Sequence, residues 1–585
     1  MILRRSVLLA SLLLIVSSVG FCDNAIMGRY NPEQNSFTTE KLEPPLILSW
    51  EFTATKYRGN PAAPVVADGV CYIACGDRVY AVDVETGNAK WKYPQDQSLT
   101  SVVKATPQII EGRLYFGTAD GKLYCLDAET GVFQWFFETR GALRCPPITL
   151  DGITYLGCDD NSIYTLDAAT GDVAWTKPFV ARDDFANGIA VGSGMVVGSS
   201  MDGNVYGINA SSGKLRWAFR MPSAPVKTSP AMTENITIMA VGNVIYGLTT
   251  RSGQRKWMIQ LPSEAACTPS TDGIDIFVPC HDKKLYCYNI AGRQPALKWT
   301  QPADIGGTPM SSPTIADQIV YVTASHGVVS GYSVADGTLK WRYVFTPSSI
   351  NASGAAGMDA SSSPVVSNGA LFVLTDDGVL HCFTKAAPDT TPPDIYSATP
   401  ANGRQISGSP PIKFSAVIYD QGSGVDFNSA QMTLDADALE LKPNFATGSV
   451  SYTFDAVDPK QTAVKPLADG LHSVTLTVND YAGNQSKATW TFVVNNMLPT
   501  PKRTTVATPI GRSTTSPNTG GQNNRVRGNS RGGVTGRSAG NIETPPPPPG
   551  MSPDSGHNND HNDGGYGGRR GGRNRGGDSA PPPPN

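Results

Sequence analysis

The stretch LYCLDAETGVFQW, residues 123–135, decides the fold, because similar stretches precede and follow it along the chain. In each copy alternating apolar positions lead into a polar turn, and a tryptophan ends the copy. Seven copies end at Trp91, Trp135, Trp175, Trp217, Trp257, Trp299 and Trp341. Successive tryptophans are 40 to 44 residues apart, which is the length of a four-stranded propeller blade. The sequence therefore predicts an all-β propeller.

An eighth copy, residues 362–385, is incomplete. It supplies three strands and stops before any tryptophan, whereas residues 46–52, LILSWEF, place Trp50 41 residues before Trp91. We expect residues 46–52 to pair with the strand around His381 and Phe383. Such pairing would close an eight-bladed ring and remove an open sheet edge.

The repeats also predict how the blades are held together. We expect each tryptophan to be buried between neighbouring blades, because a single sheet leaves one face uncovered. Asp83, Asp127 and Asp167 each precede a Thr-Gly turn, where a carboxylate can accept backbone N–H bonds. These acidic residues are therefore interpreted as turn chemistry, and no catalytic residue is predicted.

The first twenty residues have the layout of a secretory signal peptide. Arg4 and Arg5 precede an apolar run from Val7 to Val16, and small residues follow. This run is too short to span a bilayer, and no later stretch is long enough, so no transmembrane segment is expected. Residues 1–20 are predicted to be removed on export; lipid attachment at Cys22 is the alternative.

The repeat core, A-x-D-x-x-T-G-x-x-x-W, resembles the pyrroloquinoline-quinone-type repeat of the quinoprotein alcohol dehydrogenase-like propellers over residues 46–385. The compact blades look most like the BamB-type propellers, which belong to the outer-membrane β-barrel assembly machinery and are not enzymes. The enzymatic branch implies a quinone stacked on a Trp, a Ca²⁺ ion, an Asp base and a disulfide between adjacent cysteines. This chain has no Cys-Cys pair and no long inserts between strands.

Ten cysteines would suggest disulfides in an exported chain. Cys125, Cys287 and Cys382 occupy one repeat position, and Cys75, Cys158 and Cys280 occupy another. We therefore interpret them as small buried apolar residues. Without ligand spacing, no metal site and no cofactor are predicted from them.

Three cations precede the inner strands at one repeat position: Lys104, Arg144 and Lys227. On an acidic body they could ring a channel mouth and attract an anionic ligand or an acidic peptide, so they are the candidate partner-binding residues. The alternative is that they are solvated or locally paired charges.

After a linker at residues 386–391, residues 392–496 look like a bacterial immunoglobulin-like β-sandwich, and about seven short alternating strands support this. Asp420, Asp426 and Asp480 could bind Ca²⁺ there, although turn-capping explains them better. Residues 497–585 form a Gly/Arg/Pro-rich tail that we predict to be disordered.

The charge is unevenly distributed along the chain. Residues 23–496 carry 34 Lys and Arg against 45 Asp and Glu, whereas the tail has 11 against 5. An acidic body argues against nucleic-acid binding. The basic tail suggests an anionic polysaccharide or an acidic partner; the alternative is a solubilising tether.

The function predicted from the sequence is a non-enzymatic, monomeric, protein-binding scaffold of the cell envelope, of the BamB type. It would be periplasmic, associated with the outer membrane or extracellular, with protein partners in the envelope. Two alternatives stay open: a secreted adhesin or polysaccharide-binding protein, and a quinone-dependent dehydrogenase.

Overall fold

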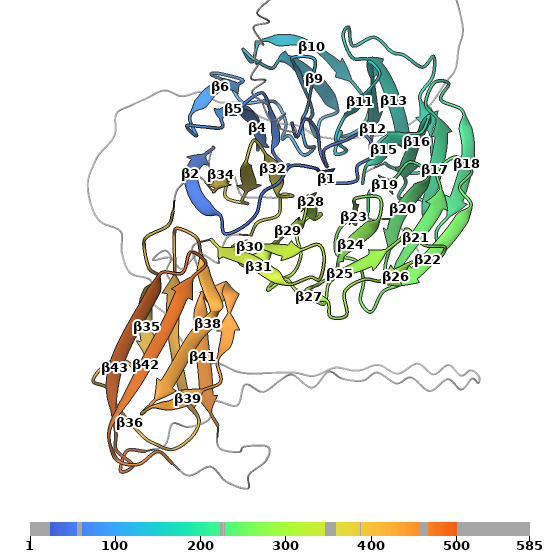
Figure 1. The fold of residues 1–585 in the computed structure, drawn as a ribbon. Coiled ribbons are helices and arrows are strands. Elements are labelled where there is room, and N and C mark those ends of the chain that lie inside the picture. The colour runs from blue at the N-terminus through green and yellow to red at the C-terminus, as the bar shows by residue number, and fades with distance from the viewer. Residues whose placement is uncertain are drawn as a thin grey trace, which may run out of the picture. The chain divides into compact units, whose positions relative to one another are not determined.

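The computed structural model describes residues 24–54, 61–185, 187–222, 226, 228–345, 359–385, 388–455 and 466–499 (Figure 1). The predicted signal peptide, Cys22, Lys227 and nearly all of the predicted tail lie outside these residues, and nothing in the structure tests them. Within the described ranges no helix is long and apolar enough to cross a membrane.

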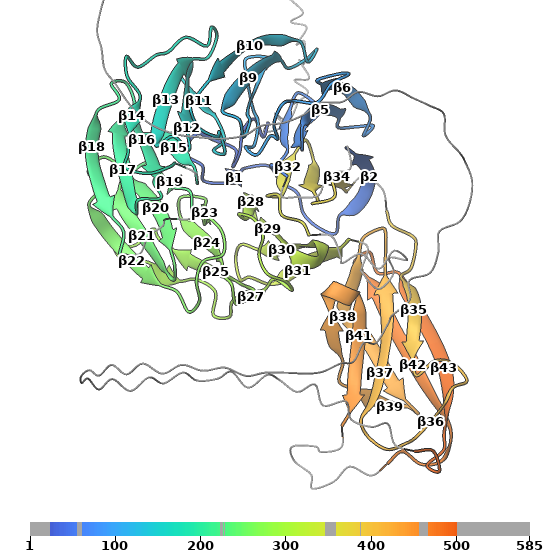
Figure 2. The ribbon, with the colours of Figure 1, turned by 180° about the vertical axis from the view of Figure 1, so that it is seen from behind.

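Eight sheets in the described part of the chain surround a common centre, as Figure 1 and, from behind, Figure 2 show. We number them as blades 1 to 8 in chain order. Blade 1 contains β3 (Val65–Ala67), β4 (Val70–Cys75), β5 (Arg78–Asp83) and β6 (Ala89–Tyr93), and blade 2 contains β7 (Gln108–Ile110), β8 (Arg113–Gly117), β9 (Lys122–Asp127) and β10 (Phe133–Glu138). Blade 3 contains β11 (Ile148–Leu150), β12 (Ile153–Gly157), β13 (Ser162–Asp167) and β14 (Phe179–Val180), and blade 4 contains β15 (Ile189–Gly192), β16 (Met195–Ser199), β17 (Asn204–Asn209) and β18 (Leu215–Arg220).

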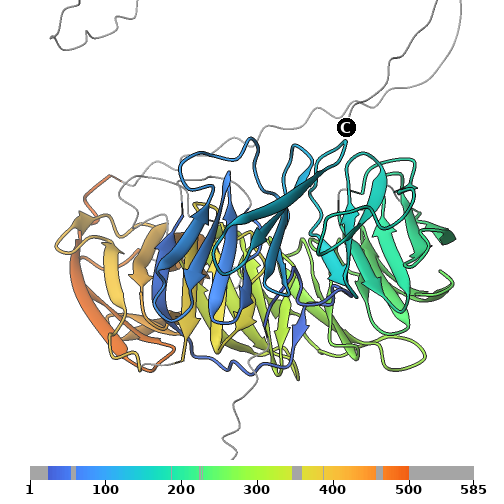
Figure 3. The same ribbon diagram turned by 90° about the horizontal axis from the view of Figure 1, so that it is seen from above.

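Blades 5 to 8 follow the same order, from the inner to the outer strand, and Figure 3 shows several blades side by side. Blade 5 contains β19 (Ala231–Met232), β20 (Ile236–Val241), β21 (Val244–Thr249) and β22 (Arg255–Gln260). Blade 6 contains β23 (Ser270–Thr271), β24 (Asp275–Pro279) and β25 (Lys284–Asn289), and both β26 (Ala296–Leu297) and β27 (Ala303–Asp304) pair with β25. Blade 7 contains β28 (Thr314–Ala316), β29 (Ile319–Ala324), β30 (Val328–Ser333) and β31 (Leu339–Val344), with the 3-10 turn η1 (Ser325–Gly327) between β29 and β30. Blade 8 contains β32 (Val365–Ser367), β33 (Ala370–Leu374), β34 (Val379–Thr384) and β2 (Ile47–Thr53).

The last blade is completed by the amino-terminal strand. β2 pairs antiparallel with β34, so that Trp50 lies opposite Cys382 and Leu48 opposite Phe383. A buried apolar cluster containing Val66, Phe372 and Cys382 then joins blade 8 to blade 1. Comparable clusters join each of the remaining pairs of neighbouring blades. The predicted closure of the ring is therefore confirmed.

The tryptophans link each blade to the next. The indole Nε1 of Trp91 donates to the carbonyl of Ala128, and the ring lies on Gly131, the glycine of the following turn. Gly131 has a φ of +70°, and a Cβ there would lie 2.7 Å from Cδ2 of Trp91. The Thr-Gly turn and the tryptophan of the motif thus form one joint between neighbouring blades, because a side chain at the glycine would displace the ring.

Residues 24–38, which we call the inner segment, run along the inner strands of the ring and include β1 (Phe37–Thr38). In Figures 1 and 2, β1 lies near the middle of the ring. Carbonyl groups of the segment accept N–H bonds from six inner strands, at Val66, Ile109, Val191, Met232, Thr271 and Ile315. The hydroxyl of Tyr30 accepts a further bond from the backbone N–H of Val366 in blade 8. The segment therefore connects seven of the eight blades.

The second domain consists of two sheets around one apolar core that includes Phe414, Leu476 and Phe492. One sheet contains β35 (Asp394–Thr399), β37 (Ile412–Tyr419), β41 (Ser449–Phe454) and β40 (Lys442–Asn444). The other contains β36 (Gln405–Ile406), β43 (Gln485–Val494), β42 (Gly470–Asp480), β38 (Val425–Leu434) and β39 (Asp437–Leu439), and a 3-10 turn, η2, covers Phe445–Thr447. A β-sandwich is thus present, while its immunoglobulin-like class and the predicted domain boundaries stay predictions.

Candidate functional site: the channel pocket

A pocket of about 380 Å³ lies where the chain enters the inner strands of the ring. Its volume is at the lower end of the range for small-molecule sites. Its lining residues directly precede β3, β7, β11, β23, β28 and β32, because the same entry bend recurs in each blade. They are Pro61, Ala62, Ala63, Lys104, Thr106, Arg144, Pro146, Ala266, Cys267, Thr268, Met310, Ser311, Ser312, Ser361, Ser362 and Ser363. None of these described lining residues is acidic.

The structure places two of the three predicted cations in this pocket. Lys104 and Arg144 both line it, as their shared repeat position predicts, and Lys227 lies outside the described residues. Arg144 is also locally paired, since its Nε lies 3.0 Å from Oδ2 of Asp159. Burial raises the pKa of Asp159, and Arg144 opposes that shift. The role of these cations in binding stays a prediction.

A third cation, Arg29 of the inner segment, was not predicted from the sequence. Its Nη2 donates to the carbonyl of Pro269, which directly follows the lining residue Thr268. Its Nε and Nη1 are buried and have no hydrogen-bond partner among the described residues. Burial lowers the pKa of Arg29 to about 9, and the nearby Cys267 opposes the shift. The segment before the first repeat has no periodicity that could have indicated this position.

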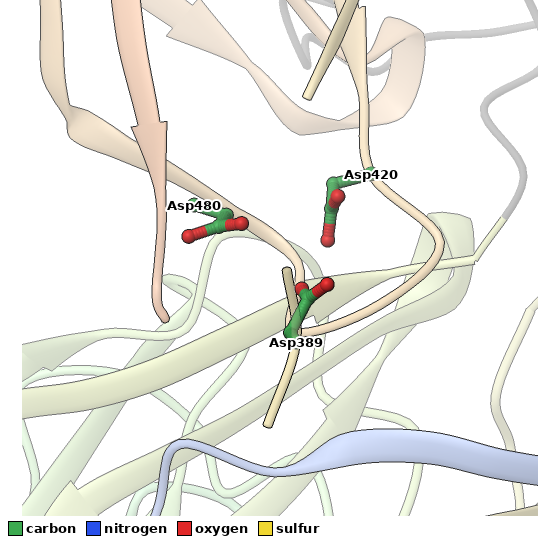
Figure 4. Close-up of side chains that lie close together, drawn as sticks. All are labelled: Asp389, Asp420 and Asp480. Carbon is green, nitrogen blue, oxygen red and sulfur yellow. The ribbon is translucent and has the colours of Figure 1, made fainter. Parts of the chain in front are cut away.

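Three carboxylates meet in the second domain, from Asp389, Asp420 and Asp480 (Figure 4). One oxygen from each lies within 4.8 Å of the others. The structure thus brings Asp420 and Asp480 together, whereas Asp426 lies outside the cluster. Each of the three clustered carboxylates accepts a backbone N–H, from Ser423, Gly424 and Asn484 respectively. These bonds agree with the turn-capping interpretation, and we assign no ion to the cluster.

The nine described cysteines are free thiols, and eight of them are buried, with Cys267 partly exposed. Burial raises the pKa of Cys125 and of Cys75 to about 11. Such thiols stay protonated at neutral pH, so they are poor nucleophiles and poor metal ligands. Their predicted role as small buried apolar residues is consistent with this burial.

The pocket fits a quinone cofactor of the kind that the repeat implies only in part. Lys104 and Arg144 supply positive charge for the carboxylates of such a quinone. No tryptophan is among the described lining residues, because most of the repeat tryptophans pack against the turn glycines of the neighbouring blades. No lining carboxylate is described that could hold Ca²⁺ or act as a base. We therefore derive no reaction step through a quinone or a metal ion.

The propeller repeats match a known protein family. A family model described as "Outer membrane protein assembly factor BamB" matches residues 48–142, 76–184 and 159–400. These matches together span more than half of the chain. The chain belongs to this family. The predicted pyrroloquinoline-quinone-type propeller is thereby confirmed.

The curated relatives of this BamB-family chain include quinone-dependent dehydrogenases. The quinohemoprotein alcohol dehydrogenase of Comamonas testosteroni is 37% identical over 102 residues, which is 16% of this chain and 14% of the relative. The quinoprotein alcohol dehydrogenase PedH of Pseudomonas putida is 33% identical over 115 residues, 18% of this chain and 19% of the relative. The chain thus matches less than a fifth of the length of either enzyme.

Some solved structures are similar to part of the chain. BamB of Moraxella catarrhalis has 16% identity and a TM-score of 0.45, with coverage of 58% of this chain and 99% of BamB. A quinohemoprotein alcohol dehydrogenase of Pseudomonas putida has 14% identity and a TM-score of 0.49, with coverage of 65% and 84%.

The named relatives correct one prediction. We expected a non-enzymatic scaffold, and the curated relatives are alcohol dehydrogenases, which are enzymes. The error has a physical cause. The compact repeat specifies how one blade packs on the next, and this packing is shared by enzymes and non-enzymes. It therefore carries no information on what the channel holds.

Proposed function

We propose that the chain is an exported oxidoreductase that holds an acidic quinone in the channel pocket. The observation that carries this proposal is the sequence match to two quinone-dependent alcohol dehydrogenases. The charge of the pocket supports it, since Lys104 and Arg144, the latter also paired with Asp159, line the cavity and no described lining residue is acidic. The predicted signal sequence at residues 1–20 supports export.

In this proposal Lys104 and Arg144 bind and orient the cofactor. A quinone with several carboxylates carries negative charge at neutral pH, and a lysine and a guanidinium bind carboxylates by charge-assisted hydrogen bonds. When bound, the quinone would supply the two-electron acceptor that alcohol oxidation needs. The protein's contribution at this stage is therefore binding and orientation.

The proposal is tested with the purified full chain, pyrroloquinoline quinone and Ca²⁺. We expect saturable binding of the quinone, measured by its fluorescence, and oxidation of ethanol coupled to an artificial electron acceptor. The double variant Lys104→Glu/Arg144→Glu should weaken quinone binding.

The matched control is Arg255→Glu/Lys256→Glu, which makes the same change of charge at two exposed positions of β22. It should bind the quinone as the wild-type protein does. Absence of both quinone binding and alcohol oxidation in the wild-type protein would overturn the proposed function.

A further inference from the structure

The inner segment carries a positive charge that the described protein does not neutralise. The Nε and Nη1 atoms of Arg29 are buried without a hydrogen-bond partner among the described residues, although each carries an N–H donor. No described carboxylate forms an ion pair with this guanidinium. The carboxylate of Glu33, on the same segment, lies against Gly192 of blade 4.

A buried charge without a partner is costly, so its retention indicates a missing partner. A guanidinium with a pKa of about 9 is still charged at neutral pH. Buried ions in proteins are usually paired, because desolvation of a lone ion is expensive. The fitting partner for this charge is an anion that supplies oxygen acceptors.

The channel pocket lies beside this charge. Pro269, whose carbonyl accepts from Nη2 of Arg29, directly follows Cys267 and Thr268, which line the pocket. The guanidinium therefore neighbours residues that line the pocket, Cys267 among them. Thr268 can also contribute, because its Oγ1 accepts the N–H of Ser229 and its own O–H can donate to a ligand.

We propose that the channel pocket binds a small polycarboxylate whose innermost carboxylate pairs with Arg29. Lys104 and Arg144 line the same pocket and meet the remaining negative charge. The ligand class is a polycarboxylate because the cations are spread over several blades and the pocket is lined by hydroxyl groups. This inference concerns the pocket of the proposed function, but it requires no redox chemistry.

Binding in this manner couples the ligand to the inner segment. Arg29 lies on the same segment whose carbonyl groups accept bonds from six inner strands. An anion held by Arg29 should therefore hold the segment in the ring. Ligand binding should raise the melting temperature of the propeller and slow hydrogen exchange at the N–H groups of Val191, Met232 and Thr271.

The test uses benzene-1,3,5-tricarboxylate, a polycarboxylate without a quinone, and the full chain. By calorimetry we expect saturable binding to the wild-type protein and a loss of affinity of about 10- to 100-fold in Arg29→Met, the range for a hydrogen bond to a charged group. Arg29→Lys should retain part of the affinity, because it keeps the charge. The control Arg255→Met, on the exposed face of β22, should bind as the wild type does.

A structural role for Arg29 gives a different result. If Arg29 only holds the segment, Arg29→Met lowers the melting temperature without ligand. If it awaits an anion, the unliganded melting temperature stays the same or rises, and only the increase caused by the tricarboxylate is lost. Wild-type affinity in Arg29→Met, or no binding by the wild-type protein, overturns the inference.

The same variants separate this inference from the proposed function. Tricarboxylate binding that depends on Arg29, without any quinone-dependent oxidation, supports the inference and contradicts the oxidoreductase. Quinone-dependent oxidation that is unchanged in Arg29→Met supports the oxidoreductase and contradicts the inference.

Discussion

The indole Nε1 of Trp341 donates a hydrogen bond of 2.8 Å to the carbonyl oxygen of Ser423 in the second domain. In six other repeats the indole donates to the turn of the next blade, as Trp299 does to Val334. Blade 8 has no such turn, because its third strand leads out of the ring. The loop between β37 and β38 takes the place of the missing turn.

The Trp341 contact predicts a link between the two domains. Trp341→Phe should lower the free energy of unfolding by about 2 to 3 kcal/mol, since it deletes ring volume at a fully buried site and removes the donor that the Ser423 carbonyl accepts from. Trp299→Phe, the control, removes an equivalent bond to Val334 within the ring. Both variants should lose similar stability in urea. Only Trp341→Phe should speed hydrogen exchange around Gly424; equal exchange in both variants would contradict the link.

The joint between Trp91 and Gly131 predicts a large effect of one methyl group. Gly131→Ala should cost about 2 to 4 kcal/mol, which combines the strain of a left-handed residue with overpacking against the indole. Gly112→Ala should cost only about 1 kcal/mol, because Gly112 also has a positive φ but a Cβ there meets nothing within 4 Å. Denaturant titrations measure both values. Equal costs would show that the tryptophan does not restrict Gly131.

A contact of β2, the strand that closes the ring, predicts that the stability of the propeller decreases at acidic pH. His381 Nδ1 lies 2.9 Å from Oε1 of Glu51, and this contact holds the pKa of Glu51 below its usual value. A carboxyl whose pKa is lowered by folding stabilises the protein above its unfolded pKa and loses that contribution as the pH falls through the folded pKa. Glu51→Gln should therefore destabilise the ring at pH 7 and have little effect well below pH 4.

Melting temperatures of the wild type and of Glu51→Gln across this range check the prediction. Glu85→Gln, in an exposed turn of blade 1, serves as the control, and its difference from the wild type should not follow the same curve. A constant difference between Glu51→Gln and the wild type at all pH values would count against a stabilising contact between Glu51 and His381.

The carboxylate cluster of Asp389, Asp420 and Asp480 predicts the opposite pH dependence, a stability that falls as the pH rises. Burial raises the pKa of Asp420 to about 7, and the charges of Asp389 and Asp480 act in the same direction. Between about pH 4 and pH 7 the folded state therefore binds more protons than the unfolded chain, and stability falls as the pH rises. Asp420→Asn should remove this fall and be more stable than the wild type at pH 8. Asp426→Asn, outside the cluster, should leave the slope unchanged in thermal melts.

The sequence predicted those parts of the fold that side-chain patterns encode. Trp50 shares the spacing of the repeat tryptophans, and the predicted pairing of its strand with the strand around His381 and Phe383 is confirmed. Lys104 and Arg144 share a repeat position, so their meeting at one pocket followed from symmetry.

The remaining features had no such signal. The inner segment binds the blades mainly through its own carbonyl groups, and a backbone contact leaves no pattern of residue types. The position of Arg29 depends on the path of that segment. Likewise, the contact of Trp341 with Ser423 joins two domains whose sequences share no repeat.

The paired residues Trp50 and Cys382 are 332 positions apart along the chain. The amino-terminal strand is therefore synthesised first but finds its partner last, and the ring has a high contact order. Contacts between such distant residues form slowly. Any factor that holds residues 46–52 elsewhere leaves β34 without its outer partner, so the ring closes only when the amino-terminal strand arrives.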